Sequence, residues 1–209
     1  MSTQKLISLT FDDGPNVVTT PQVLDILQKH GIPASFFVVG NNITPESAEV
    51  MRRAAEMGCE IENHSRTHSD MTKMSAEEIT AEITYTSDKV EEAVGRRPKF
   101  FRPPYIAYNE TMFQTIDMTF ICGVGADDWD DAVSVEERYK RITAQAADGT
   151  VILLHDTTGN AKTVQAIDMI IPKLKEEGYE FVTVSRLFER ENAAPKRGVV
   201  YTSVFDGGR

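Results

Sequence analysis

The chain contains few cysteines and no long hydrophobic run. Its 209 residues include two cysteines, Cys59 and Cys122, which lie in neither a CxxC pair nor a cysteine–histidine metal motif. We therefore expect two free thiols packed at or near strands, rather than a disulfide or a catalytic nucleophile. No apolar stretch approaches the roughly 20 residues that span a bilayer, and we expect no membrane contact.

The chain also lacks a nucleotide-binding glycine motif and has fewer basic residues than acidic ones. Neither GxGxxG nor a Walker sequence follows the first strand-like segment, so nothing supports a nucleotide-binding fold. Acidic residues outnumber basic ones by 32 to 22, which gives a net charge of -10 and a pI near 4.9. An acidic protein is poorly suited to bind nucleic acid or an anionic membrane surface. Neutral or cationic substrates are more compatible with this charge.

Strand-like and helix-like segments alternate over almost the whole chain. The strand-like segments are residues 6–11, 34–39, 60–63, 99–102, 120–124, 150–154 and 180–184. Helical spacing and end signals mark residues 21–30, 45–57, 75–94, 109–116, 134–147, 163–177 and 185–190. This alternation predicts a parallel sheet, closed or partly closed into a barrel. We expect one α/β domain over residues 1–191 and an irregular tail over 192–209, with disorder in the last three residues.

Two adjacent carboxylates, Asp12 and Asp13, follow the first strand directly, and Gly14 and Pro15 then turn the chain. Like charges side by side are costly unless a bound cation separates their roles, with one carboxylate as ligand and the other as base. The alternative is an acidic turn, since Asp-Asp-Gly-Pro is also good turn chemistry. Chemistry in α/β folds gathers at the carboxyl ends of strands, which is where this pair lies.

The histidines favour a metal site. Three of the four histidines, His64, His68 and His155, fall at predicted strand ends. His64 and His68 are four residues apart, so one turn of helix would place both on one face. Imidazoles combined with a carboxylate are common ligands for zinc and similar divalent ions. The alternative is a pair of surface histidines near a helix cap.

Polar residues also follow the fourth strand. Arg102 is positioned to pair with Asp12 and hold it ionised, unless it forms only a surface ion pair. Pro103 and Pro104 have no N–H group and stiffen the loop. The Tyr105 N–H would then be a free donor in a rigid setting, which suits an oxyanion.

The fifth and sixth strands lead to candidates for a general acid and its partner. Asp127 and Asp128 precede Trp129, the only tryptophan, which is either a core residue or a platform for a sugar ring. His155 ends the sixth strand. A carboxylate nearby, such as Asp128, would raise the pKa of His155 and suit it to general-acid catalysis.

Five motifs in this order resemble the NodB-type polysaccharide deacetylases, carbohydrate esterase family four. They are Thr-Phe-Asp-Asp-Gly-Pro at 10–15, His-Ser-Arg-Thr-His at 64–68, Arg-Pro-Pro-Tyr at 102–105, Asp-Trp at 128–129 and Leu-Leu-His-Asp at 153–156. The resemblance covers residues 6–187. It implies a distorted (β/α) barrel of about seven parallel strands that removes acetyl groups from sugars with a divalent metal.

The resemblance implies a metal centre with a base beside it. Asp13, His64 and His68 would be the metal ligands, with zinc expected and cobalt or nickel as alternatives. Asp12 would be the catalytic base, and Arg102 would orient it.

The resemblance also implies the remaining parts of the site. The Tyr105 N–H would bind the oxyanion, and Leu153 would line the acetyl pocket. His155 would be the acid, tuned by Asp128, with Trp129 as a wall of the substrate groove.

In one motif the chain departs from the family. Members often have an aspartate three residues before the Asp-Trp pair, where this chain has Gly125, and Asp127 stands beside Asp128 instead. The sequence therefore leaves open whether Asp127 or Asp128 supports His155. Similar gaps occur in acetyl-xylan esterase members, which this compact chain resembles.

The expected function is a metal-dependent hydrolase that removes O-acetyl groups from xylan. An N-deacetylase for chitin oligomers or peptidoglycan is the alternative within the family, although the acidic charge slightly disfavours anionic cell-wall polymers. A carbohydrate-binding domain without turnover is the alternative of another class. The expected partner in each case is a polysaccharide or oligosaccharide.

The N-terminal segment and the family resemblance lead to an expected location and domain organisation. The segment 1–5 lacks the apolar core of a signal peptide. We expect a secreted or extracellular monomer that forms one domain of a longer multidomain enzyme, with a cytoplasmic location as the alternative.

Overall fold

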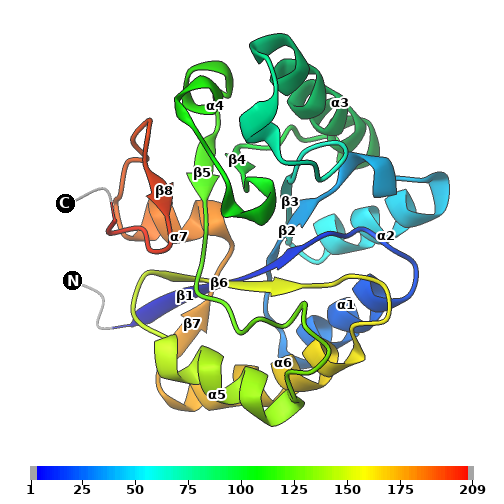
Figure 1. Cartoon of the computed structure of the whole chain (residues 1–209). Helices are drawn as coiled ribbons and strands as arrows, with labels where there is room; N and C mark the ends of the chain where they lie inside the picture. The colour runs from blue at the N-terminus through cyan, green and yellow to red at the C-terminus, as the bar shows by residue number, and fades with distance from the viewer. Residues whose placement is uncertain (1–3, 207–209) are drawn as a thin grey trace.

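The structure, a computed structural model, describes residues 4–206 (Figure 1). The disorder expected for residues 207–209 concerns residues outside this described range. Most of the segment 1–5 also lies outside it. Within residues 4–206, no helix combines the length and the apolar character needed to cross a bilayer.

The described residues form strands β1 to β8 and helices α1 to α7. The strands are β1 Lys5–Asp12, β2 Ser35–Val38, β3 Glu60–Asn63, β4 Phe100–Phe101, β5 Thr119–Ile121, β6 Thr150–His155, β7 Tyr179–Phe181 and β8 Val200–Tyr201. The helices are α1 Thr19–His30, α2 Pro45–Glu56, α3 Ala76–Val94, α4 Glu110–Thr115, α5 Val135–Gln145, α6 Ala161–Glu176 and α7 Val184–Arg190. Short 3-10 turns lie at η1 Gly40–Asn42, η2 Met71–Lys73 and η3 Pro104–Ile106.

The strands form a parallel, nearly closed barrel, which confirms the predicted fold class. Their order is β6-β1-β2-β3-β4-β5-β8, and β7 pairs with the early part of β1. A parallel bridge between Val124 and Ile152 joins the segment after β5 to β6. Gly123 permits this approach, because it has a φ of 149° and an added Cβ would lie 2.9 Å from the Leu153 Cβ.

Two expectations at the C-terminal end differ from the structure. The last predicted strand was expected to reach residue 184, but β7 ends at Phe181. The Thr183 side chain accepts a hydrogen bond from the Arg186 N–H, so it caps α7 and makes Val184 helical. The tail, expected to be irregular, contains β8, whose Val200–Tyr201 pairs in parallel with β5.

The alternation of side chains along β1 separates two layers of the core. Ile7, Leu9 and Phe11 belong to the cluster between the sheet and the surrounding helices. Leu6 faces the other way, into a cluster that includes residues of α7 and β8. Because neighbouring strand residues point to opposite faces, the buried Asp12 lies on the same inner face as Leu6. Helices α5, α6, α1, α2, α3 and α4 follow one another around the outside (Figure 1).

The strand register brings several chain segments to one edge of the barrel. Asp12 pairs in register with Phe37 of β2 and with His155 of β6. Asn63 of β3 pairs with Phe101 of β4. The residues that follow these strand ends therefore meet at the same rim, as the parallel sheet predicts.

Candidate active site

A cleft of about 590 Å³ opens at the carboxyl ends of the strands. All but one of the predicted site residues line this cleft. These lining residues are Asp12, Asp13, His64, His68, Tyr105, Asp128, Trp129, Leu153 and His155. The exception is Arg102, which is fully buried next to the cleft. The structure therefore brings together all of the residues that the motifs selected.

Asp13, His64 and His68 form the candidate metal centre. The Asp13 Oδ1 lies 3.3 Å from the His68 Nε2 and 3.6 Å from the His64 Nε2. The three candidate ligand atoms lie within 4.8 Å of one another. The Arg102 carbonyl oxygen accepts a hydrogen bond from the His64 Nδ1 at 2.6 Å. Because a carbonyl can only accept, the proton is on Nδ1, and the lone pair of Nε2 is available to a metal.

These side chains fit a divalent cation. The Asp13 Oδ1 is buried and has no hydrogen-bond partner among residues 4–206. Burial lowers the pKa of His64 in spite of the charges of Asp12 and Asp13, which favours the neutral, metal-binding form of the imidazole. A carboxylate with two imidazoles is a donor set typical of zinc and related ions. A bound cation would satisfy this unpaired Asp13 oxygen.

The two histidines converge through a loop and not through a turn of helix. β3 ends at Asn63, and residues 64–70 form no regular element. Ser65 and His68 have φ values of 64° and 56°, in the left-handed region, and these bend the chain back over the cleft. The Asn63 Oδ1 accepts from the Ser65 N–H, and the Ser65 Oγ accepts from the His68 N–H. The expected helical turn was therefore wrong, although the convergence on Asp13 is found.

Asp12 is held by a buried arginine. The Arg102 Nη1 donates to the Asp12 Oδ1 at 2.5 Å, and both side chains are almost completely buried. Arg102 also lies over the Phe37 ring, with its guanidinium carbon 4.1 Å from the ring centroid. Burial raises the pKa of Asp12, but the charge of Arg102, with those of His64 and His155, outweighs burial and leaves the pKa below its usual value. The Asp12 carboxylate is therefore ionised and able to accept a proton.

The loop after β4 places Tyr105 at the cleft. Tyr105 has a φ of 59°, within the short 3-10 turn η3. The adjacent Ile106 N–H donates to the Pro103 carbonyl, but no acceptor for the Tyr105 N–H occurs among the described residues. The Tyr105 ring is 70% exposed and contacts the edge of the His68 imidazole, with ring centroids 4.7 Å apart. Among residues 4–206 the Tyr105 N–H is therefore unpaired, in a residue that lines the cleft, and its role as the oxyanion donor stays a prediction.

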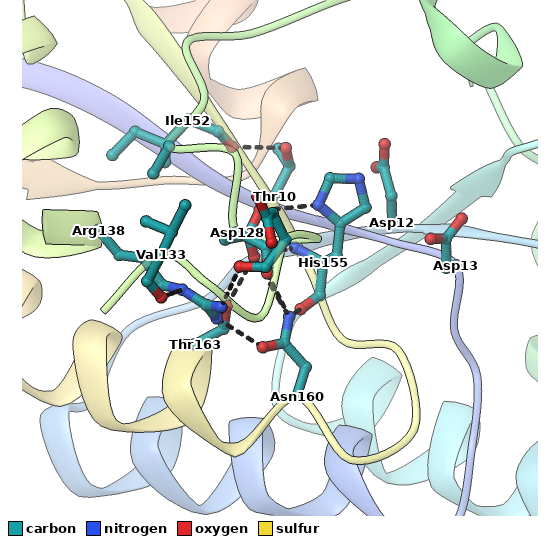
Figure 2. A network of polar contacts seen from close by, with 12 residues as sticks. Thr10, Asp12, Asp13, Asp128, Val133, Arg138, Ile152, His155, Asn160 and Thr163 are labelled. Atoms are coloured by element: carbon teal, nitrogen blue, oxygen red, sulfur yellow. Dashed lines mark hydrogen bonds and ion pairs between the residues drawn. The ribbon is translucent and has the colours of Figure 1, made fainter. Parts of the chain in front are cut away.

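His155 is oriented by Asp128. The His155 Nδ1 lies 2.8 Å from the Asp128 Oδ1, and the His155 N–H donates to the Asp128 Oδ2 at 2.8 Å. The imidazole lies between Asp128 on one side and Asp12 and Asp13 on the other (Figure 2). Burial lowers the pKa of His155, but the hydrogen bond and charge of Asp128, with the charges of Asp12 and Asp13, raise it to about 9. The imidazole is therefore protonated at neutral pH and can act as an acid.

The structure decides between the two neighbouring aspartates. Asp127 has a φ of 52° and points to the surface, where its Oδ2 accepts from the Arg141 Nη1 at 2.7 Å. Asp128 is 1% exposed and contacts His155. Trp129 is 67% exposed and lines the cleft, so it is not a core residue.

Three residues behind Asp128 were not selected from the sequence. Arg138 of α5 is buried and donates to the Asn160 Oδ1 and the Thr163 Oγ1, and both of these residues contact Asp128. One signal was present in the sequence. Arg138 lies four residues before Ile142, on the buried face of α5, where a charged residue is unusual.

Residues with positive φ gather around the cleft. Of the seven residues other than glycine with positive φ in the described part of the chain, five line the cleft: Asp13, His68, Tyr105, Ile106 and Asp127. Such conformations cost free energy, which the surrounding structure must offset, and they cluster at functional sites. For the β-branched Ile106 the conformation is particularly unfavourable.

Both cysteines are free, as expected. Cys59 is buried immediately before β3, and burial raises the pKa of its thiol to about 11. Cys122 follows β5 and is half-buried at the cleft wall. Neither lies among the candidate metal ligands.

Comparison with known proteins assigns this geometry to one family. Residues 2–119 match the family model described as polysaccharide deacetylase. A bifunctional xylanase/deacetylase of Pseudobutyrivibrio xylanivorans is 48% identical over 92% of this chain, and a peptidoglycan-N-acetylglucosamine deacetylase of Listeria monocytogenes is 37% identical over 89%. The chain spans 32% and 39% of the length of these two relatives.

Solved structures agree over nearly the full chain. The Xyl-CE4 domain of a multidomain xylanase from the hindgut metagenome of Trinervitermes trinervoides aligns with a TM-score of 0.96 at 47% identity, covering 98% of this chain and 100% of that one. A family 4 acetyl xylan esterase from Clostridium thermocellum, in complex with a cobalt ion, aligns with a TM-score of 0.93 at 41% identity, covering 96% and 99%.

Proposed function

The chain belongs to the polysaccharide deacetylase family, and we propose that it is a metal-dependent esterase that removes O-acetyl groups from xylan. The observation that carries the proposal is the convergence of an ionised base, a candidate metal centre and a protonated imidazole in one cleft. Xylan is proposed because the two solved structures described above are named as a xylanase domain and an acetyl xylan esterase.

Asp13, His64 and His68 are proposed to hold the cation, with zinc as the expected metal. Bound there, a divalent cation would supply Lewis-acid chemistry, which makes water more acidic and stabilises negative charge on oxygen. The relative solved in complex with a cobalt ion supports a divalent metal without selecting zinc.

Asp12 is proposed to act as the base. Its Oδ1 is occupied by Arg102, and its Oδ2 faces the centre, 3.7 Å from the His64 Nε2. In this position Asp12 accepts a proton from the water that attacks the acetyl carbonyl carbon. Arg102 keeps the carboxylate ionised and fixes which oxygen is available.

The Tyr105 N–H and His155 are proposed to complete the reaction. As the carbonyl oxygen becomes negative, the Tyr105 N–H donates a hydrogen bond to it, an interaction worth about 3 kcal/mol in comparable oxyanion sites. When the tetrahedral intermediate collapses, the His155 Nε2 donates its proton to the departing sugar oxygen, and acetate is released. The Asp128 carboxylate stabilises the imidazolium before this transfer.

The alternative within the family is removal of N-acetyl groups. It is favoured by one observation, the 37% identity to a peptidoglycan-N-acetylglucosamine deacetylase. The same base and acid serve an amide, although a nitrogen leaving group depends more strongly on protonation by His155. The net charge of -10 makes an anionic cell-wall polymer a less favourable partner than neutral xylan.

We also propose that the chain acts outside the cell as one domain of a longer enzyme. Xylan is an extracellular polymer, and the Trinervitermes structure is described as a domain of a multidomain xylanase.

The test is acetate release from acetylated xylan and from N-acetylglucosamine oligomers, measured side by side with added zinc or cobalt and with a chelator. We expect chelator-sensitive release from xylan, and none from the oligomers. The Asp12→Asn variant serves as the control, since it removes the base while leaving the three candidate ligands in place.

The other outcomes overturn the proposal in distinct ways. Release from the oligomers alone would make the chain an N-deacetylase. No release from either substrate, with metal bound, would indicate a carbohydrate-binding domain that lacks turnover.

A further inference from the structure

Arg138 is a buried cation without a carboxylate partner among the described residues. It is 1% exposed, and its guanidinium donates to oxygen atoms of four neutral groups. Two of these are the carbonyls of Val133 and Asp130, each at 3.0 Å. The others are the Asn160 Oδ1 at 2.6 Å and the Thr163 Oγ1 at 2.9 Å. Burying a charge costs free energy, so we expect Arg138 to have a role in the protein that offsets this cost.

The guanidinium fixes the direction of the hydrogen bonds around it. Arginine has five N–H donors and no acceptor. The Thr163 hydroxyl must therefore accept from Arg138, and its own hydrogen is free to be donated to the Asp128 Oδ2 at 2.6 Å. For the same reason the Asn160 oxygen faces Arg138, and its NH₂ group donates to the carbonyl oxygens of Asp128 at 3.2 Å and His155 at 3.0 Å.

This arrangement distributes the two oxygens of Asp128 between different partners (Figure 2). Oδ2 accepts from the Thr163 hydroxyl and from the His155 N–H. Oδ1 is left for the His155 Nδ1, at 2.8 Å. The imidazole therefore donates from Nδ1 to the carboxylate, and its Nε2 faces away from Asp128.

The side chain of Asn160 belongs to this network and does not cap its own helix. Asn160 is the N-cap residue of α6, a position where asparagine ordinarily accepts from a backbone N–H of the first turn. Here its side chain makes no capping bond and is used instead for Arg138, Asp128 and His155.

We propose that Arg138, Asn160 and Thr163 are positioning residues for the acid step. Together they orient the Asp128 carboxylate and complete its hydrogen bonding, so that His155 keeps the proton on Nε2 that the leaving oxygen takes. The inference rests on the proposed function for its activity readout, but its structural readout does not depend on any substrate.

Other charged groups also face His155 and must be kept constant in a test. Asp12 and Asp13 approach from the end of β1, and Arg102 reaches Asp12 from the end of β4. The metal centre lies on that same side. None of these groups contacts Thr163 directly, so a change at position 163 alters only the Asp128 side of the imidazole.

The test compares Thr163→Val with Thr163→Ser. Valine has the shape of threonine without the hydroxyl, whereas serine retains the hydroxyl. Arg138→Met is avoided because it removes four buried hydrogen bonds at once and so tests folding together with the acid step. The proteins, each loaded with Zn²⁺, are titrated by histidine NMR, with the His155 signal assigned from His155→Gln. The pH profiles of kcat and KM for acetate release are measured in parallel.

We expect Thr163→Val to shift the pKa of His155 by about one pH unit, which corresponds to a tenfold change in the protonation equilibrium. The alkaline limb of the kcat profile should move by the same amount, with KM within twofold of wild type. Thr163→Ser should restore both the pKa and the profile.

The proposal is overturned if Thr163→Val and Thr163→Ser show the same His155 titration. It is also overturned if Thr163→Val loses activity with an unshifted profile, because a merely structural role gives that result. If the protein releases no acetate from any substrate, the proposed function fails, and the NMR comparison still decides the role of Thr163.

Discussion

Asp12 and Asp13 are adjacent in the chain, and a carboxylate oxygen of each lies within 3.7 Å of the same His64 Nε2, yet they have opposite environments. Asp12 is 2% exposed and paired with Arg102. Asp13 turns away with a φ of 73°, and its buried Oδ1 has no partner in the described part of the chain. The two carboxylates are therefore suited to different tasks, proton transfer for Asp12 and metal binding for Asp13.

Asp12→Asn should abolish turnover and leave metal content unchanged. The amide cannot accept the proton, and loss of a general base typically costs about 10²- to 10⁴-fold in rate. Acetate release and bound metal would be measured on the same preparation. Rates near those of wild type would show that another group is the base.

His64→Ala should lose both metal and activity, because it removes one of three ligands. In wild type, added zinc should raise the melting temperature and a chelator should lower it, since a ligand that binds only the folded state stabilises it. Neither change is expected in His64→Ala. The matched control is His30→Ala, because His30 pairs with Asp168 on the helical surface, outside the cleft. Equal metal loss in both variants would contradict the assignment.

The rate should decline on the alkaline side as His155 loses its proton. The folded-state pKa of His155 is raised to about 9, so the limb should lie at or below pH 9, and a bound cation would move it lower. Asp128→Asn should shift this limb downward by roughly one to two units. Asp127→Asn is the matched control, since Asp127 contacts Arg141 at the surface. An unshifted limb in Asp128→Asn would exclude the Asp128–His155 pair as its origin.

The same pair makes stability depend on pH, with a definite sign. The folded-state pKa of His155 lies above the ordinary value of 6.5, so the folded state holds this proton more tightly than the unfolded chain. The stabilisation is fully present below about pH 6.5 and is lost as the pH rises through about 9. Urea denaturation of wild type and Asp128→Asn across this range would measure it, with a smaller pH dependence expected in the variant.

Arg102→Met should destabilise the fold by about 3–5 kcal/mol, because it leaves the Asp12 carboxylate buried without its cation. The double variant Arg102→Met with Asp12→Asn should recover part of this loss, since no unpaired charge then remains. Urea denaturation of the two single variants and the double variant gives the coupling energy. Strict additivity would mean that the pair contributes nothing beyond its separate members.

Trp129→Ala should weaken the use of polymer and leave the fold intact. The side chain is 67% exposed, so the change in unfolding free energy should stay within about 0.5 kcal/mol. The value of kcat/KM on acetylated xylan should fall several-fold, while that on a small aryl acetate should not. Tyr108→Ala is the control, because Tyr108 is exposed but packs against Phe113 away from the cleft. Equal losses on both substrates would show that Trp129 acts on the chemistry and not on polymer binding.

The sequence predicted the site well because strand ends are visible in it. Asp12, His64 and His155 each stand at the end of a strand-like run, and a parallel barrel must collect such ends at one rim. Contacts away from the rim could not be predicted from the sequence in the same way. Arg138 and Thr163 meet Asp128 from two different helices, and no spacing in the chain encodes that meeting.

The errors also have physical causes. The HxxxH spacing is compatible with a helix, but left-handed residues at Ser65 and His68 achieve the same convergence in a loop. Val182, Thr183 and Val184 favour a strand by composition, but the Thr183 side chain caps a helix. β8 has two residues, too few to show any period, and is formed only because β5 offers a free edge.

The strands of the barrel wall are paired to different extents. β1 pairs along its length with three strands, whereas the segment after β5 is joined to β6 by two backbone hydrogen bonds of Val124. Local opening begins where pairing is sparsest, so amide hydrogens at this seam should exchange faster than those of β1. The loop that carries Trp129 adjoins the seam, while Asp12 ends the best-held strand. Opening at this seam would therefore displace the wall next to Trp129 and leave Asp12, at the end of β1, in place.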